Sequence, residues 1–481
     1  MQPSGERGPN TVTLSVKAQC YYNHGTGGLA GPSAAAAAQM EGSEDGDRLH
    51  SQTHASDEAV RVTRLHPQLH ARQEGIHATG EGAGAIRRRG IFPAALASPI
   101  EDDDLLREIL LRLLRQPSSL LRASAVCKQW RCAATDPKFL RRFGLHHQKP
   151  PLLGVFQQRT YDDIVFTPIL DHPDRIPPQR FNLNLGDSGS RTELQVLMLD
   201  CRHGRVLLTN EPPQDHVIVC DPIIGEQRRV QVPPEFKLCY DVNWAVLCSA
   251  SNHDHVHGSC HSSPFKLVLI SPLGEDNRLA ACVYSSETGI WSNIISTAVP
   301  YEIHYVGISG LLVGNSLCWL LDPISDGILE FDLDDESLAV IRGPLVTNDF
   351  SHDSPWIIHA EDGALGFAVL SYHHLQLWQR NTNCHGAATW VLRNTIDMRA
   401  ILGLPPQIEV MKKGILGCVE DADEILLWVG RSVYMVQLKS MQSRKLCEIS
   451  HFTYCHSFKS FYPPGTTIAG GHDGAEMLHE T

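Results

Sequence analysis

The feature that most constrains the fold is a series of short apolar runs between residues 152 and 461. The runs consist of β-forming residues, turn-forming residues separate them, and long stripes of helical periodicity are scarce. Such a pattern predicts an all-β region. The clearest runs are VLMLD (196–200), RVLLT (205–209), HVIVCDP (216–222), KLVLIS (266–271), LAACVYS (279–285), SLCWLLD (316–322), ILEFDL (328–333), LGFAVLS (365–371), EILLWVG (424–430) and SVYMVQL (432–438).

A diffuse repeat is visible within this region. A strand ends in a polar turn and a second strand follows, and the equivalent positions are Val219, Val283, Phe331, Leu377 and Val436. Their successive spacings are 64, 48, 46 and 59 residues. Blades of a β-propeller recur with a period of roughly 40–50 residues, so about 310 residues correspond to around six blades. A pair of β-sandwiches is the alternative architecture.

A second, shorter region from Ser98 to Phe143 has the periodicity of helices instead. Leu105, Ile109 and Leu113 are spaced by four residues each, and Leu106 and Leu110 lie beside them on the same wide apolar stripe. Three short helices are expected here, preceding the all-β region in an α+β, multi-domain chain. We expect domain boundaries at 96–146 for the helices and 150–465 for the strands.

The remaining two helices of this region carry further apolar residues. After a Pro-Ser-Ser break, the residues that repeat at helical spacing are Leu120, Ala123, Cys127, Trp130 and Ala134, with Val126 beside them. Asp136 and Pro137 then supply a cap and a first-turn proline for the third helix. Because about 45 residues lie near the lower size limit of an independent core, the surplus apolar surface indicates a partner protein. The competing interpretation is that these stripes are simply core.

The start of the first helix carries several polar signals. Ser98, Pro99 and Glu101 fit a capping box, and three aspartates, 102–104, place negative charge in the first turn. An acidic run could also hold a metal ion, but no histidine or second acidic cluster lies nearby in the sequence. A solvated helix start is therefore the expected role of this run.

These residues resemble an F-box. The resemblance is carried by Pro99, Glu101-Asp102, Leu105-Leu106-x-x-Ile109-Leu110-x-x-Leu113, Ser119-Leu120, Val126-Cys127-Lys128-x-Trp130-Arg131 and Asp136-Pro137-x-Phe139-Leu140. F-boxes bind a Skp-type adaptor and through it a cullin. The resemblance implies adaptor contacts by Pro99, Leu105, Leu106, Ile109, Leu110, Leu113, Leu120, Val126, Cys127 and Trp130, of which Trp130 is the candidate for the largest contribution. Two positions depart from the family. Ser98 stands where the family has a leucine, and Leu114 stands where the family has a proline. The change at Leu114 could lengthen the first helix.

The all-β region resembles the kelch-like, F-box-associated β-propeller domains of large plant families. The segments that carry this resemblance are the turn Asp221-Pro222-x-x-Gly225, VYSSETGxW, ILEFDLDDESLAVI and VYMVQLKSMQSRKL. A glycine-doublet kelch signature and a Trp-Asp repeat are both absent from the sequence. The resemblance implies a domain that holds a protein substrate on its loops.

Composition narrows the class of protein. A formal net charge of −13 argues against nucleic acid or an anionic membrane as a partner. No apolar run is long enough to cross a bilayer. The 14 cysteines are scattered, several within apolar strands, which favours reduced thiols and a cytoplasmic or nuclear location.

The first 95 residues are rich in Gly, Ala, Ser, His and Gln and are expected to be disordered. Residues 466 to 481 are expected to form a flexible tail. Gly25-x-Gly27-x-x-Ala30 matches a dinucleotide fingerprint superficially. Because Pro32 interrupts the helix that would have to follow, we expect no cofactor there.

One group of residues has the composition of a metal site: Cys248, His253, His255, His257, Cys260 and His261. Cysteine and histidine together suit zinc. Ser, Asn, Asp and Gly fill the gaps, however, so a solvated insertion between two strands is the favoured interpretation and no metal is expected. Local motifs for a hydrolase elbow, a P-loop or a metalloprotease are absent.

Together these features predict a substrate-recognition subunit of a Skp–cullin–F-box ubiquitin ligase, without catalysis or a cofactor of its own. Its partners would be a Skp-family adaptor, a cullin and an unknown protein substrate. The alternatives are a propeller-based enzyme or metal-binding protein, and a degenerate F-box protein that acts as a simple binding module.

Overall fold

The computed structural model describes residues 102–465, except for 161–162, 182, 184–194, 212–214, 237–241, 251–254, 273–277, 299–308, 322–326, 345–353, 372–373, 384–386, 405–412 and 451–452. Several of the predictions concern residues outside this part of the chain. They are the N-terminal segment 1–95 with its dinucleotide-like pattern, the tail 466–481, and the residues Ser98, Pro99 and His253.

The predicted helical region contains four helices, because the second expected helix is divided in two. Cys127 has an extended backbone, with φ −162° and ψ 175°, and it separates the two halves. The helices are α1 (Asp103–Leu111), α2 (Pro117–Ser124), α3 (Lys128–Thr135) and α4 (Pro137–His147).

The first helix begins and ends at other residues than the sequence suggested. Asp102 is its N-cap, and the carboxylate accepts hydrogen bonds from the backbone N–H groups of Asp104 and Leu105. The acidic run therefore caps and charges an exposed helix start, as expected. Because α1 ends at Leu111, Leu114 does not lengthen it.

The four helices share a small core. Leu106, Leu110, Phe139 and Phe143 are almost fully buried in it, and Phe461, from the far end of the strand region, packs among them. The helices therefore cover their core with help from the strand domain. This contact explains how so short a helical segment is stabilised.

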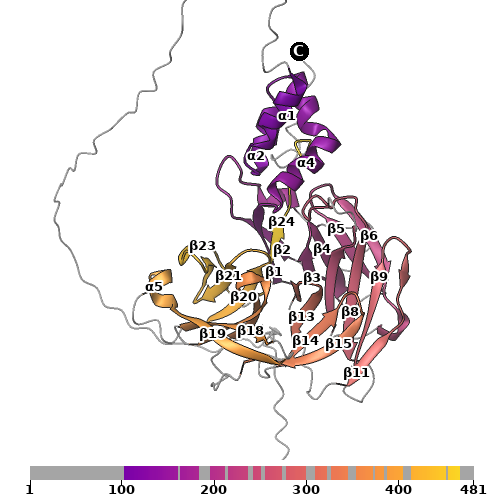
Figure 1. Cartoon of the computed structure of the whole chain (residues 1–481), viewed down its shortest axis with the longest axis vertical. Helices are drawn as coiled ribbons and strands as arrows, with labels where there is room; N and C mark the ends of the chain where they lie inside the picture. Colours follow the sequence, from indigo (N-terminus) through magenta and orange to yellow (C-terminus); the bar gives the residue numbers. More distant parts are fainter. Residues whose placement is uncertain are drawn as a thin grey trace, which may run out of the picture. The chain divides into compact units, whose positions relative to one another are not determined.

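The strand region forms six separate antiparallel sheets (Figure 1). Five of them use consecutive strands. Their strands are β3 (Gln195–Arg202), β4 (Arg205–Glu211), β5 (His216–Asp221) and β6 (Glu226–Gln231); β7 (Asn243–Cys248), β8 (Phe265–Pro272), β9 (Arg278–Ser285), β10 (Ile290–Trp291) and β11 (Ile295–Ala298); β12 (Leu311–Val313), β13 (Ser316–Leu320), β14 (Gly327–Asp332) and β15 (Ser337–Arg342); β16 (Ser354–His359), β17 (Leu365–Ser371), β18 (His374–Thr382) and β19 (Ala388–Asp397); and β20 (Lys413–Val419), β21 (Glu424–Val429), β22 (Ser432–Gln437) and β23 (Gln442–Glu448).

The sixth sheet joins the two ends of the strand region. Its order is β2-β1-β24, in which β1 (Leu152–Thr160) and β2 (Asp163–Pro168) pair with β24 (Cys455–Lys459). The register places Val155 opposite Ser457 and Phe156 opposite His456. The last strand of the described residues therefore closes the ring of sheets.

Apolar clusters fill the spaces between neighbouring sheets. One cluster joins β1 to β3–β5 and includes Phe156, Phe458 and Leu208, and another joins β1 and β24 to β20–β22 and includes Val155 and Leu416. Four further clusters join the remaining neighbours in turn. Each sheet thus buries both of its faces against other sheets, which is the construction of a six-bladed propeller.

This architecture confirms the predicted propeller and excludes the pair of sandwiches. The five repeat markers, Val219, Val283, Phe331, Leu377 and Val436, all lie on the third strand of their sheets, β5, β9, β14, β18 and β22. The two longest spacings have structural causes. Residues 249–264 are inserted between β7 and β8, and the short helix α5 (Met398–Leu402) follows β19.

Across the described residues, no helix is long and apolar enough to cross a membrane. The eleven cysteines in this part of the chain are all free thiols, in agreement with the predicted reduced state.

Candidate functional site

The helical region exposes a group of apolar side chains. Leu105 and Ile109 lie one turn apart on α1 and have exposed fractions of 40% and 37%. Val126, between α2 and α3, is 61% exposed, and its neighbour Cys127 is exposed too. Leu114, after α1, is 72% exposed. Here we name Leu105, Ile109, Val126 and Cys127 the helical face.

A hydrogen bond between two helices brings parts of this face together. The side-chain amide of Gln129 on α3 donates to the carboxylate of Asp103 on α1 over 2.9 Å. Because Gln129 lies close to Val126 in the chain and Asp103 lies close to Leu105, the bond holds the α2–α3 junction beside the first turn of α1.

Other residues that the F-box resemblance assigns to adaptor contacts point into the molecule. Leu106, Leu110 and Leu120 are at most 4% exposed and belong to the helical core, and Leu113 and Trp130 pack partly against that core. These five side chains therefore contribute to the core of the helical region. Pro99 lies outside the described residues.

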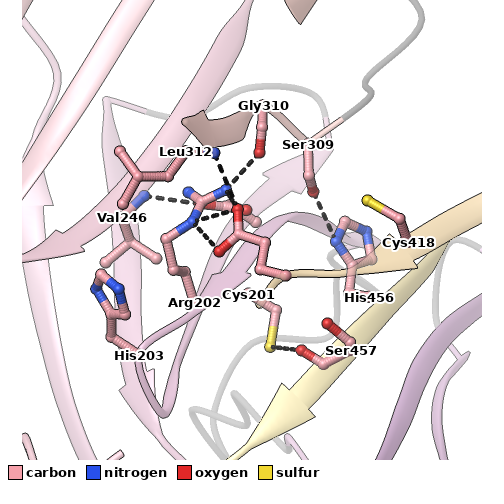
Figure 2. A network of polar contacts seen from close by, with 12 residues as sticks. Cys201, Arg202, His203, Val246, Ser309, Gly310, Leu312, Cys418, His456 and Ser457 are labelled. Atoms are coloured by element: carbon pink, nitrogen blue, oxygen red, sulfur yellow. Dashed lines mark hydrogen bonds and ion pairs between the residues drawn. The ribbon is translucent and has the colours of Figure 1, made fainter. Parts of the chain in front are cut away.

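A buried polar group lies on or next to the first strands of neighbouring sheets (Figure 2). Arg202, at the end of β3, forms ion pairs with Asp200 over 2.8 Å and with Glu420, which follows β20, over 2.7 Å. Its guanidinium also donates to the carbonyl oxygen of Gly310. Glu420 also accepts a hydrogen bond from the backbone N–H of Leu312 over 3.1 Å.

The same group reaches the sheet that begins with β7 and the closing strand β24. Asp200 accepts a hydrogen bond from the backbone N–H of Val246 on β7 over 2.8 Å. On β24, His456 Nδ1 lies 2.8 Å from the hydroxyl of Ser309, and the Cys201 thiol donates to the carbonyl of Ser457 over 3.4 Å. These polar contacts therefore connect five of the six sheets or the segments that lead into them.

Burial controls the ionisation of this group. Burial raises the pKa of Asp200. Burial also acts to raise the pKa of Glu420, but the Arg202 guanidinium and the backbone N–H of Leu312 together bring that pKa below its usual value. Burial lowers the pKa of His456 to about 4, so this histidine is neutral near pH 7. The charges are paired with one another and with backbone groups, an arrangement that suits a structural role.

The segment between β7 and β8 brings part of the predicted metal cluster together. Donor atoms of Cys248, His255, His257 and Cys260 all lie within 4.8 Å of one another. His261 is not among them, because its Nδ1 lies 2.8 Å from the carboxylate of Asp221. The segment is also not simply the solvated insertion that the sequence favoured, since Cys260 is 1% exposed.

Sequence reasoning missed the central group of Asp200, Arg202 and Glu420. A signal was present, because each residue lies within or next to an apolar run, in VLMLDCR and ILGCVED. A charged residue in such a run is either exposed or paired. Local sequence does not show which distant residue is its partner.

Comparison with known proteins gives two family matches. The family described as "F-box-like" matches residues 103–146, and the family described as "F-box protein AT5G49610-like, beta-propeller" matches residues 197–464, more than half of the chain. No curated protein matches the sequence.

Solved structures show only remote similarity. The extracellular domain of the one-component system BT4673 of B. thetaiotaomicron is 12% identical with a TM-score of 0.29, over 54% of this chain and 29% of that one. Puromycin hydrolase is 12% identical with a TM-score of 0.29, over 54% and 40% of the two chains. The Dos1 propeller is 10% identical with a TM-score of 0.27, over 62% and 67%. The chain thus spans less than half the length of the first two.

The helices of the F-box-like match and the six sheets of the propeller agree with both family matches. The chain therefore belongs to the plant-type family of F-box proteins with an AT5G49610-like β-propeller.

Proposed function

We propose that this protein is the substrate-recognition subunit of a Skp–cullin–F-box ubiquitin ligase. An F-box-like region implies binding to a Skp1-type adaptor, and the exposed apolar side chains of the helical face are the observation that carries the proposal. The propeller would hold a protein substrate. In this role the chain has no catalytic step of its own, and it acts in the cytoplasm or the nucleus.

The helical face has enough apolar surface for specific docking. Leu105, Ile109 and Val126 together retain a large part of their surface in the free chain. Completing the burial of a large aliphatic side chain contributes up to about 1.5–3 kcal/mol, of which these partly exposed residues have roughly half left to gain. Association costs offset part of the sum, so additional polar contacts at the rim of the face are expected.

The function follows from holding two proteins together. With the adaptor on the helices and a substrate on the propeller, the transferring enzyme of the ligase meets substrate lysines at a raised effective concentration. Positioning alone can supply a large rate gain, so the chain needs no nucleophile or metal at its substrate-binding surface.

The decisive experiment measures the affinity of the purified chain for a Skp-type adaptor. The double variant Leu105→Ala, Ile109→Ala removes two exposed side chains and leaves the helical core intact. We expect its affinity to fall about 10- to 100-fold, which corresponds to the loss of about 1.4–2.8 kcal/mol of contact energy. Isothermal titration against the same adaptor gives both affinities.

Ile290→Ala is the matched control, because Ile290 is an aliphatic residue that is 67% exposed on β10 of the propeller. Its affinity for the adaptor should equal that of the wild type. No measurable adaptor binding by the wild-type chain would refute the proposal and support the degenerate F-box instead. Equal affinities for the double variant and the wild type would remove the helical face from the docking site.

A further inference from the structure

The segment between β7 and β8 contains four side chains whose positions suit one metal ion. Cys248 ends β7, and His255, His257 and Cys260 follow before β8. The Nε2 atom of His255 lies 3.2 Å from the sulfur atoms of both Cys248 and Cys260, and Cys260 Sγ lies 3.7 Å from His257 Nδ1.

These separations lie close to the edge lengths of a zinc tetrahedron. Bonds of about 2.3 Å to sulfur and about 2.0 Å to nitrogen, at tetrahedral angles, place neighbouring donor atoms about 3.3–3.8 Å apart. Two thiols and two imidazoles are also the donor set of many structural zinc sites, and sulfur ligands disfavour Mg²⁺ and Ca²⁺.

Neighbouring residues contact the backbone of both cysteines and the ring of His257. His203, in the turn between β3 and β4, accepts a hydrogen bond at Nδ1 from the backbone N–H of Cys248 over 3.0 Å. Its ring stacks on that of His257 with centroids 3.7 Å apart. Arg205 donates to the carbonyl oxygens of Cys260, over 2.6 Å, and Ser263, over 2.5 Å. Three of the four donor residues, Cys248, His257 and Cys260, are therefore contacted by residues outside the segment.

The same segment joins the propeller to the helices. Val256, between the two histidines, packs against the helical core. The carbonyl oxygen of Gly258 accepts hydrogen bonds from the backbone N–H of Phe461 over 2.9 Å and from the hydroxyl of Ser460 over 3.0 Å. Gly258 has φ +97°, and a Cβ there would lie 2.6 Å from Pro150, which follows α4. The four donor residues thus enclose the piece of chain that contacts the helical region.

We propose that Cys248, His255, His257 and Cys260 bind one structural Zn²⁺ ion, which holds the β7–β8 segment in place and so stabilises the joint between the helices and the propeller. Four protein ligands complete the tetrahedron and leave no open position for a substrate or a reactive water. Zinc binding at this site does not depend on which proteins the chain binds. Its main rival is a disulfide between Cys248 and Cys260, which would not need the histidines.

The first test is the metal content of the full chain, purified after removal of any affinity tag and without chelator. Elemental mass spectrometry should find about one zinc per chain. Cys248→Ser and His255→Asn should each retain less than a tenth of that zinc, whereas Cys132→Ser, which changes an exposed cysteine on α3, should retain all of it. Zinc well below one per chain in the wild type, or equal zinc in all variants, would overturn the proposal.

Two further measurements decide the outcome even if a variant fails to fold. Wild-type chain loaded with Co²⁺ should show the intense visible bands of a tetrahedral site and a thiolate-to-metal absorption band. Intact mass after thiol alkylation should show both cysteines reduced; a Cys248–Cys260 disulfide would instead refute the zinc site.

The structural role has its own readout. Hydrogen exchange of the wild-type chain should become at least 10-fold faster in residues 256–260 and in the link 144–150 when the zinc is removed with a chelator. Exchange in β17 and β18, on another sheet, should stay the same. Unchanged exchange at the joint would contradict the stabilising role.

Discussion

The guanidinium of Arg202 contacts the carboxylate of Glu420 with Nη2 and Oε1 2.7 Å apart, although 218 positions separate the two residues in the chain. The Arg202 side chain is 3% exposed and that of Glu420 is 19% exposed. This buried pair connects the first strand of one sheet to the segment that leaves the first strand of another. Its loss should therefore affect the whole ring.

Glu420→Gln is expected to destabilise the protein by about 3 kcal/mol, because it leaves the buried Arg202 charge with a single carboxylate partner. Urea unfolding followed by tryptophan fluorescence measures the change. Lys445→Gln breaks an ion pair between exposed side chains, Lys445 and Glu448, and serves as the control. A Glu420→Gln variant as stable as the control would show that the pair contributes little.

Stability should fall between pH 7 and pH 5 because of His456. Its pKa is lowered from 6.5 to about 4 by burial. The unfolded chain therefore takes up a proton near pH 6.5, whereas the folded chain remains neutral until about pH 4. The free energy of unfolding is therefore highest, as far as His456 is concerned, above pH 6.5. It decreases as the pH falls, by about 2 kcal/mol between pH 7 and pH 5.

The measurement compares urea midpoints at pH 7 and pH 5 for the wild type and for His456→Gln. The variant should lose about 2 kcal/mol less than the wild type over this range. The exposed His374→Gln should behave as the wild type does. An identical pH dependence for His456→Gln and the wild type would contradict the assignment.

Gly417→Ala should destabilise the contact between β20 and the closing strand. A Cβ at this position would lie 2.4 Å from the backbone oxygen of Cys455 on β24, which cannot move without disturbing the sheet. The expected cost is about 1–3 kcal/mol, measured by thermal or urea unfolding. Gly465→Ala is the control, since a Cβ there meets nothing within 4 Å. Equal effects of the two substitutions would mean that the contact is easily relaxed.

Two adjacent leucines on α1 should separate stability from binding. Leu106 is fully buried, so Leu106→Ala should cost about 2–5 kcal/mol and lower the melting temperature of the helical region. Leu105 is 40% exposed, so Leu105→Ala should leave melting nearly unchanged and reduce only adaptor affinity. Circular dichroism and adaptor titration of both variants distinguish the two effects. The reverse pattern would contradict the orientation of α1.

Features set by local interactions were predictable from the sequence, whereas features set by contacts between distant residues were not. Alternating apolar runs and polar turns are local, so they predicted the strands, and the repeat markers identified the third strand of five sheets. The break at Cys127 was missed, because Trp130 and Ala134 continue the apolar spacing that Leu120 and Ala123 begin. The pairing of β1 with β24 joins residues such as Gln157 and Cys455, 298 positions apart, and no local pattern reports it.

The candidate sites show the same limit. Helical spacing showed that Leu105, Leu106, Ile109 and Leu110 share an apolar stripe, but the stripe is wide enough to serve both the core and the surface. Which leucine faces solvent depends on α3 and α4 and on Phe461. Likewise, the spacing of Cys248 and Cys260 gave the composition of a metal site, whereas the distances between donor atoms required the fold.

The pairing of β24 with β1 also fixes when the propeller can first be complete. A ribosome makes β24 after every other strand of the described residues, so the nascent chain carries β1 with one edge unpaired while the other sheets form. Such an edge is a template for pairing with a neighbouring chain. Folding during synthesis therefore leaves this domain open to misassembly until its last strand is available, and a chaperone that shields β1 would act in that interval.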